Sequence, residues 1–181
     1  TDNNAIYAAD ALQSLRNAKA QGALVMHNHP GWRRKSLEHP EFEVAAYGEG
    51  LIDGIEIMNG GEFYPKAISR AHTKNLFVSA NTDIHDSATE TYRAQGHRRN
   101  MTLIFAKENT LEALREAIEA RRTLAYSFGT IAGDEQLLKD LFTASVRTSV
   151  LHTDAKGRRT VSLTNNSSVQ YVLPVSYTHL R

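Results

Sequence analysis

The alternation of helical and strand-like segments constrains the fold of this chain most. Apolar residues recur at helical spacing over residues 6–21, and Gly22 follows in the place of a C-terminal glycine. The apolar run ALVMHNHP (23–30) comes next and is typical of a buried strand. Further helices are predicted over 41–51, 65–75, 110–122 and 133–145, and further strands over 54–60, 76–80, 101–106 and 123–127. This order predicts an α/β fold with a parallel sheet, open or closed into a barrel, and with helices packed outside it.

The pattern changes after Ala144. The segments SVRTSVLHT, RRTVSLT and SVQYVL alternate apolar and polar residues, and DAKG and NNSS between them are typical turn sequences. We therefore expect residues 1–144 to be part of an α/β domain. Residues 145–174 are expected to begin an antiparallel β domain.

Composition excludes several classes of protein and site. The chain has no cysteine, so a thiolate metal site, a thiol nucleophile and a disulfide are all excluded. The net charge is +1 and no long basic run occurs, which argues against a dedicated nucleic-acid partner. No apolar run approaches the ~18 residues of a membrane span. The compartment stays open.

Polar residues follow three successive predicted strands. His27, Asn28, His29 and Trp32 follow the first, Asn59, Glu62 and Tyr64 the second, and Asn81, Asp83 and His85 the third. In α/β proteins, ligands bind at the carboxyl ends of parallel strands. These residues are therefore the candidates for a functional site.

The spacing within two of these groups has a chemical use. In an extended chain, residues i and i+2 point to the same side about 6.6 Å apart, so Asp83 and His85 could reach one metal ion or two neighbouring ions. His27 and His29 share a face by the same argument. Imidazole and carboxylate together suit Zn, Mn or Fe. The alternative is a capped loop without metal, because the DxH pattern is common.

Other residues have two interpretations each. Trp32 and Tyr64 could form walls of a binding cleft or serve as packing residues. Arg98, in GHRRN with His97 and Arg99, could bind an anion such as phosphate or lie in a solvated loop. The remaining histidines are expected to face solvent: His39, His72 and His152.

Four segments together resemble the polymerase and histidinol phosphatase (PHP) family of phosphoesterases. They are LVMHNHPGW, GIEIMNGGEFYP, SANTDIH and MTLIFAKENTLEALREAIEARRTLAY, and the resemblance covers roughly residues 18–126. It implies a distorted seven-stranded β/α barrel that hydrolyses phosphate mono- or diesters with two or three divalent metal ions. The implied partner is a small-molecule phosphate ester.

The resemblance also implies roles for individual residues. His29, Asp83 and His85 match metal-ligand positions. Glu56 and Asn59 lie between them, and Asn59, Tyr64, Trp32 and Arg98 are expected to contact substrate. His27 stands where relatives tend to carry an aromatic residue, so no ligand role is transferred to it.

The chain departs from the family at its start. The family begins with an HxH motif on its first strand and carries further His and Glu ligands before the NHP turn, and none of these occurs here. Three ligands cannot fill a two- or three-metal site, because each Zn takes about four. We therefore expect a partial barrel containing only the C-terminal strands, with activity in the intact parent and doubtful activity in this chain.

The last residues resemble a translated sequencing adaptor. Residues 175–181, VSYTHLR, are therefore expected to be a non-native tail, although an ordinary polar strand after Pro174 is the alternative. Two other functions stay open beside the hydrolase. One is a sugar- or metabolite-binding module without catalysis, and the other is a structural scaffold for the β domain.

Overall fold

The computed structural model describes residues 2–32, 40–87 and 99–172. The chain divides into two compact units, Thr1–Leu138 and Lys139–Arg181, and each is described by itself. The predicted tail, 175–181, lies outside the described residues, as do His39, His97 and Arg98.

The first unit contains most of the predicted elements, with shorter bounds. Its described helices are α1 (Asn3–Ile6), α2 (Ala11–Ala20), α3 (Glu41–Gly48), α4 (Pro65–Lys74) and α6 (Leu111–Glu119). Its described strands are β1 (Met26–His27), β2 (Gly54–Asn59), β3 (Glu62–Phe63), β4 (Phe77–Asn81), β5 (Met101–Ile104), β6 (Thr123–Ser127) and β7 (Thr130–Gly133). A mixed α/β architecture is therefore confirmed.

The predicted helix over 6–21 is two helices. Asp10 interrupts it, because its carboxylate accepts hydrogen bonds from the backbone N–H groups of Leu12 and Gln13 and so starts α2 at Ala11. α1 ends at Ile6, and the backbone of Tyr7 is extended. The apolar periodicity concealed this break because it continues across both helices.

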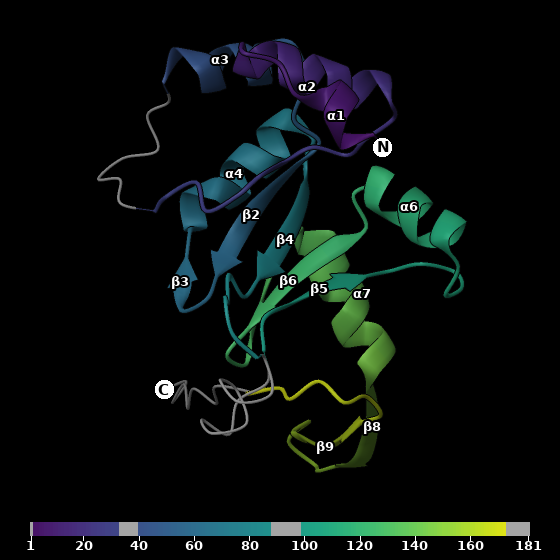
Figure 1. Ribbon diagram of the computed structural model, residues 1–181. Coiled ribbons are helices and arrows are strands. Elements are labelled where there is room, and N and C mark those ends of the chain that lie inside the picture. Colours follow the sequence, from purple (N-terminus) through teal and green to yellow (C-terminus); the bar gives the residue numbers. More distant parts are fainter. Residues whose placement is uncertain (1, 33–39, 88–98, 173–181) are drawn as a thin grey trace. The chain divides into compact units, whose positions relative to one another are not determined.

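β1, β2 and β4 form the parallel part of a four-stranded sheet. Figure 1 shows β2 and β4 side by side. β2 lies between β1 and β4, with Ile55 opposite His27 on one side and Val78 on the other. β3 pairs antiparallel with the end of β2 through the two-residue loop Gly60-Gly61, which is a typical hairpin sequence, although a strand after it was not predicted. All six residues of β2 are buried, which explains its nearly continuous apolar sequence.

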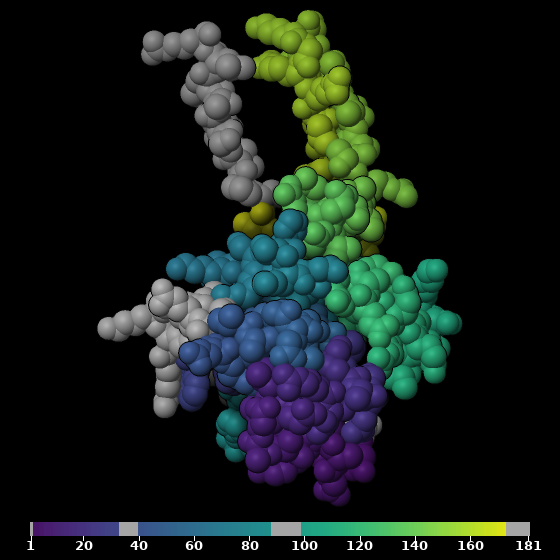
Figure 2. Space-filling view, turned by 90° about the horizontal axis from the view of Figure 1, so that it is seen from above, coloured from purple at the N-terminus to yellow at the C-terminus, as the bar shows by residue number. Residues whose placement is uncertain are grey.

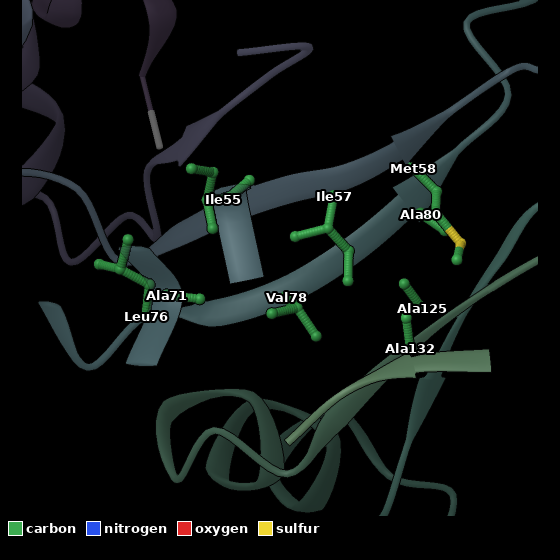
Figure 3. Close-up of a cluster of buried hydrophobic side chains, with 10 residues drawn as sticks. Ile55, Ile57, Met58, Ala71, Leu76, Val78, Ala80, Ala125 and Ala132 are labelled. Atoms are coloured by element: carbon green, nitrogen blue, oxygen red, sulfur yellow. The ribbon is translucent and has the colours of Figure 1, made fainter. Parts of the chain in front are cut away.

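The hydrophobic core lies between β2, β4 and α4 and extends to β6 and β7 (Figure 3). Ile55 and Ile57 from β2 and Val78 from β4 are buried beside Ala71 of α4. α4 begins with Pro65 in its first turn and ends where Asn75 adopts a left-handed conformation, φ 54°. Its small residues, Ala67 and Ala71, let the helix approach the sheet closely.

β5, β6 and β7 form an antiparallel three-stranded sheet, so the prediction of parallel strands throughout was wrong for this part. β6 turns directly into β7 through Phe128 and Gly129, which have φ of 45° and 81°. Positive φ at both central residues is the geometry of a two-residue hairpin. The sequence signal for this turn is weak because Phe, rather than Asn, Asp or Gly, holds the first position.

β4 meets the antiparallel strands through side-chain hydroxyls rather than a backbone ladder. The N–H of Val78 donates to Oγ1 of Thr123 at 3.0 Å, and the N–H of Ala80 donates to Oγ1 of Thr102 at 3.1 Å. The Thr102 hydroxyl also donates to the carbonyl of Ala80 at 3.3 Å. Two threonines therefore satisfy three main-chain groups on the side of β4 that faces away from β2.

The second unit is built on a long hairpin of β8 (Val146–Thr153) and β9 (Arg159–Asn165). Helix α7 (Glu135–Ser145) starts in the first unit and ends in the second. The third strand predicted at 168–173 is not formed over its described residues, because Asn165 bonds to Ser167 and Val169 and turns the chain locally. Figure 2 shows the hairpin, in yellow-green, as a narrow column of atoms.

The apolar side chains of the hairpin are open to solvent. Val150, Leu151, Val161 and Leu163 are between 45% and 67% exposed. His72 and His152 are exposed, as predicted. No helix in the described ranges is long and apolar enough to cross a membrane.

Candidate functional site at the ends of the parallel strands

The carboxyl ends of β1, β2 and β4 meet at one edge of the sheet, because these strands are parallel. His29 lies two residues beyond β1, Asn59 ends β2, and Asn81 ends β4. The N–H of Gly60 donates to the carbonyl of Asn81 at 3.0 Å and joins two of these ends. Three segments that are far apart in the sequence therefore adjoin here.

The carboxylate of Glu56 holds the three segments together. Glu56 is 1% exposed, and its Oε2 accepts hydrogen bonds from the backbone N–H of His29 and from Nδ2 of Asn59, the latter at 2.9 Å. Its Oε1 accepts from Nδ2 of Asn81 at 2.6 Å. A carboxylate removed from water needs such donors, because its desolvation is otherwise costly.

His29 begins a tight turn that packs against Tyr64. The backbone φ of His29 is 31°, which is uncommon for a residue with a side chain, and its carbonyl accepts from the N–H of Trp32 at 3.0 Å. The rings of His29 and Trp32 meet edge to face, with centroids 5.5 Å apart. A Cβ on Gly31 would lie 2.5 Å from the Tyr64 ring, so only glycine allows this close approach.

Tyr64 lies within the electrostatic influence of several carboxylates of this edge. Its hydroxyl donates to the carboxylate of Glu62. Burial, followed by that hydrogen bond and by the negative charges of Glu62, Glu56 and Asp83, raises the pKa of Tyr64 well above its usual value. The edge therefore gathers negative charge around one neutral phenol.

Asn100 forms a second layer beneath this edge. It is buried, and its Nδ2 donates to the carbonyl of Gly60 at 2.8 Å and to that of Asn81 at 2.9 Å. Its Oδ1 accepts from the hydroxyl of Ser127 at 2.9 Å. The amide therefore links the turn after β2 and the end of β4 to the antiparallel sheet.

His27 does not share a face with His29. β1 ends at His27, and the left-handed backbone at His29 breaks the alternation of side chains on which that prediction rested. The Nδ1 of His27 lies 2.7 Å from the hydroxyl of Tyr47, and its Nε2 lies 3.7 Å from Glu43. Burial, with the Arg70 charge opposing it, raises the pKa of Tyr47 to about 12. His27 thus belongs to a separate cluster with α3.

The alternation argument also does not hold for Asp83 and His85. β4 ends at Asn81, Asp83 has φ of 51°, and His85 lies in a bend, so these residues are not in extended chain. Both side chains are exposed. The two-residue spacing therefore does not place them on one side of a strand.

The described residues do not form a complete metal centre. In residues 2–32, 40–87 and 99–172, no group of three or more His, Asp or Glu side chains is arranged to hold a metal ion. His29, Asp83 and His85 offer the imidazole and carboxylate groups that Zn, Mn or Fe prefer, but they are not brought together as three ligands. The side-chain types suit a metal ion, but the described positions do not form a three-ligand metal site.

The predicted substrate contacts differ in accessibility. Trp32 is 48% exposed, and Tyr64 is partly buried. Asn59 is buried, and its side-chain amide donates a hydrogen bond to Glu56. It therefore lies inside the edge and not on its surface. Arg98 lies outside the described residues, and the neighbouring Arg99 is exposed.

A groove lies at the opposite, amino ends of the strands. Its volume is about 750 Å³, and it runs between α4, the starts of β4 and β6, and the first turn of α7. His72 and Arg121 lie on its lining, and the guanidinium of Arg121 donates to the carbonyls of Asn75 and Glu119. Because its guanidinium is bound to backbone carbonyls, Arg121 has a structural role at this end of the sheet.

The buried polar residues of this edge differ in how clearly the sequence indicates them. Glu56 stands out as a carboxylate within the apolar run GIEIMN, and that contrast was its signal. Asn100 and Ser127 were missed, because a single polar residue next to a strand carries no periodicity.

Comparison with solved structures gives an informative likeness. The chain resembles the crystal structure of a two-domain protein from Bacteroides vulgatus that is described as containing a predicted PHP-like metal-dependent phosphoesterase. The TM-score is 0.83 at 36% sequence identity, over 91% of this chain. The likeness covers 49% of the other chain, so this chain spans about half the length of that protein. No protein-family model matches the sequence, and the search of curated proteins gave no match.

Proposed function

We propose that this chain is part of a PHP-type metal-dependent phosphoesterase that hydrolyses phosphate mono- or diesters. The observation that carries the proposal is the likeness to the Bacteroides vulgatus structure, at 36% identity and a TM-score of 0.83. Identity at that level over 91% of the chain supports more than a shared architecture. We extend the proposal to the fold, in which β1, β2 and β4 would be the C-terminal part of a distorted barrel.

The proposed metal ligands from this chain are His29, Asp83 and His85. Each Zn takes about four ligands, so these three would contribute to a centre of two or three ions that residues outside the described ranges complete. A bound divalent ion would supply hydroxide near neutral pH and neutralise the phosphoryl oxygens. Asp83 and His85 are exposed and follow β4 without regular structure, which leaves them able to reach such a centre.

The charge of the edge supports a requirement for a cation. The carboxylates of Glu62, Glu56 and Asp83 all act on Tyr64. A phosphate ester is itself an anion, so it would be repelled from this edge unless positive charge were added. A metal ion would supply that charge, and we place Arg98 beside the substrate phosphate as a second source.

The substrate would lie against aromatic side chains. Trp32 is exposed and stands edge to face with His29, and Tyr64 supports the same turn from beneath Gly31. In this proposal Trp32 contacts the leaving group, and the Tyr64 phenol stays protonated at neutral pH. Asn59 acts from inside, through its hydrogen bond to Glu56.

The test uses the full gene product with an aryl phosphate monoester and diester. Activity should depend on added Mn²⁺ or Zn²⁺ and disappear with a chelator. Asp83→Ala and His85→Ala should each lower kcat/KM by more than ~100-fold, beyond the usual loss for residues that only support ligands. His152→Ala, an exposed histidine of the hairpin, is the control and should retain activity.

Two results would contradict the proposal in different ways. Full activity in both Asp83→Ala and His85→Ala would remove the ligand assignment. Ligand binding that survives chelation, without hydrolysis, would favour a sugar- or metabolite-binding module that uses Trp32 and Tyr64 as its surface.

A further inference from the structure

We propose that Glu56 is a positioning residue that fixes the turn carrying His29. Through this turn it would set the place of the imidazole at the edge of the sheet. The inference deepens the proposed function and rests on it for its catalytic meaning. Its structural content rests only on the contacts of the described residues.

The backbone of His29 needs an external constraint. Its φ of 31° lies in a region that residues with side chains rarely occupy, and such conformations persist only when the surroundings hold them. The N–H of His29 donates to Oε2 of Glu56, a charged acceptor that is 1% exposed. Hydrogen bonds to a charged group are about twice as strong as neutral ones.

The carboxylate is itself held in place from two sides. Asn59 donates to Oε2 from three residues further along β2, and Asn81 donates to Oε1 from the end of β4. Both donors are neutral amides, and no lysine, arginine or histidine side chain in the described ranges forms an ion pair with Glu56. The position of the carboxylate is thus fixed by donors from two strands.

The imidazole of His29 takes no part in these bonds. It contacts the ring of Trp32, whereas the bond to Glu56 uses the backbone N–H. Glu56 can therefore hold the turn while both ring nitrogens stay available for other partners. A residue that bonded to the ring would instead compete with a metal.

The chain offers a matched control at Glu62. This carboxylate also lies at the edge and bonds to Tyr64, but it is exposed and does not contact His29. Glu56→Gln and Glu62→Gln remove the same charge from neighbouring places, so a difference between them isolates the bond to the turn. Glu56→Gln keeps one carbonyl oxygen as an acceptor, so the variant should fold even if Glu56→Ala does not.

The first measurement is hydrogen exchange at single backbone amides by NMR. In Glu56→Gln the His29 amide should exchange roughly 5- to 10-fold faster, because a neutral acceptor replaces a charged one. The Gly60 amide, which bonds to Asn81, should change little, and Glu62→Gln should leave both amides unchanged. The nuclear Overhauser contact between the His29 and Trp32 rings should weaken, while that between Phe142 and Tyr171 persists.

The second measurement is Zn²⁺ affinity in the full gene product, by competition with a chelator. Glu56→Gln should weaken binding about tenfold, and Glu62→Gln should do so much less. The inference is overturned if the His29 amide is unaffected in Glu56→Gln, or if all β2 and β4 amides accelerate by the same factor. If the wild-type protein binds no metal, the proposed function fails, and the His29 amide still decides the role of Glu56.

Discussion

Polar side chains occur both at the strand-end edge of the first unit and in the hairpin of the second unit. Their hydrogen bonds differ in burial and in the distance between the partners along the chain. At the edge, Glu56 and Asn100 are buried, and each bonds to groups from distant parts of the chain. In the hairpin, Asp154 bonds to residues two and four positions further on, and the exposed Asn165 bonds within four residues. Water can replace the bonds of the hairpin, but it cannot easily reach those of the edge.

Burial, rather than residue type, therefore decides what a polar or apolar group contributes. The same residue types occur in both units, so paired substitutions test this difference directly.

Apolar truncation should separate the two units most. Ile57→Ala removes a side chain that is 0% exposed in the core and should lower the free energy of unfolding by about 2–5 kcal/mol. Leu163→Ala removes a side chain that is 48% exposed and should cost less than about 1 kcal/mol. Urea unfolding followed by circular dichroism measures both losses of stability. Equal losses would contradict the role assigned to burial.

Asparagine truncation should separate the polar networks. Asn100→Ala removes the buried amide that bonds to the carbonyls of Gly60 and Asn81 and to the Ser127 hydroxyl, so it should cost about 1–3 kcal/mol. Asn165→Ala exposes its partners to water and should change stability by about 0.5 kcal/mol at most. Thermal unfolding of the two variants gives the values. A larger loss for Asn165→Ala would show that the hairpin depends on its turn more than its exposure suggests.

Glycine substitution should separate packing from backbone strain. Gly54→Ala would place a Cβ 2.2 Å from the Phe77 ring, and the displacement should cost about 1–3 kcal/mol. Gly157→Ala meets no atom within 4 Å, but its φ of 78° disfavours a side chain by about 1 kcal/mol. Denaturant midpoints compare the two. Replacing Phe77 by Leu should reduce the loss at Gly54 and leave that at Gly157 unchanged.

Acid titration should show the units behaving alike. The Arg158 guanidinium lowers the pKa of partly buried Asp154 in the hairpin, and Arg16 lowers that of exposed Glu49 in the first unit. Each pair therefore contributes above the unfolded carboxyl pKa, about 4. That contribution disappears as the pH falls through the lower folded pKa. Carboxyl carbon shifts in NMR should move to higher titration midpoints in Arg158→Ala and Arg16→Ala, and no movement would exclude the ion pairs in solution.

The α/β order and the parallel pairing of β1, β2 and β4 followed from the sequence, because buried strands and amphipathic helices leave clear periodic patterns. The antiparallel β5–β6–β7 sheet did not, because the direction of a strand depends on its turns, and Phe128 gave no turn signal. Over 168–172, the described part of the third strand predicted for the second unit, local bonds of Asn165 likewise decide the conformation.

The candidate site was predicted in composition more than in geometry. Residue types placed His29, Asp83 and His85 near strand ends, but the assumption of extended chain failed at the positive φ of His29 and Asp83. Asn81 and Asn100 act through tertiary contacts, which a single sequence does not reveal. Asp83 and His85 as metal ligands stay a prediction.

The hydroxyls of Thr102 and Thr123 have a consequence for association between molecules. An unpaired strand side is a template on which a foreign strand can add and start aggregation. Here the N–H groups of Val78 and Ala80 are already occupied by the threonines, so that side of β4 has little to offer an incoming strand. A valine at either position would keep the shape and release the amide. The two hydroxyls therefore close this side of β4 and join the two sheets.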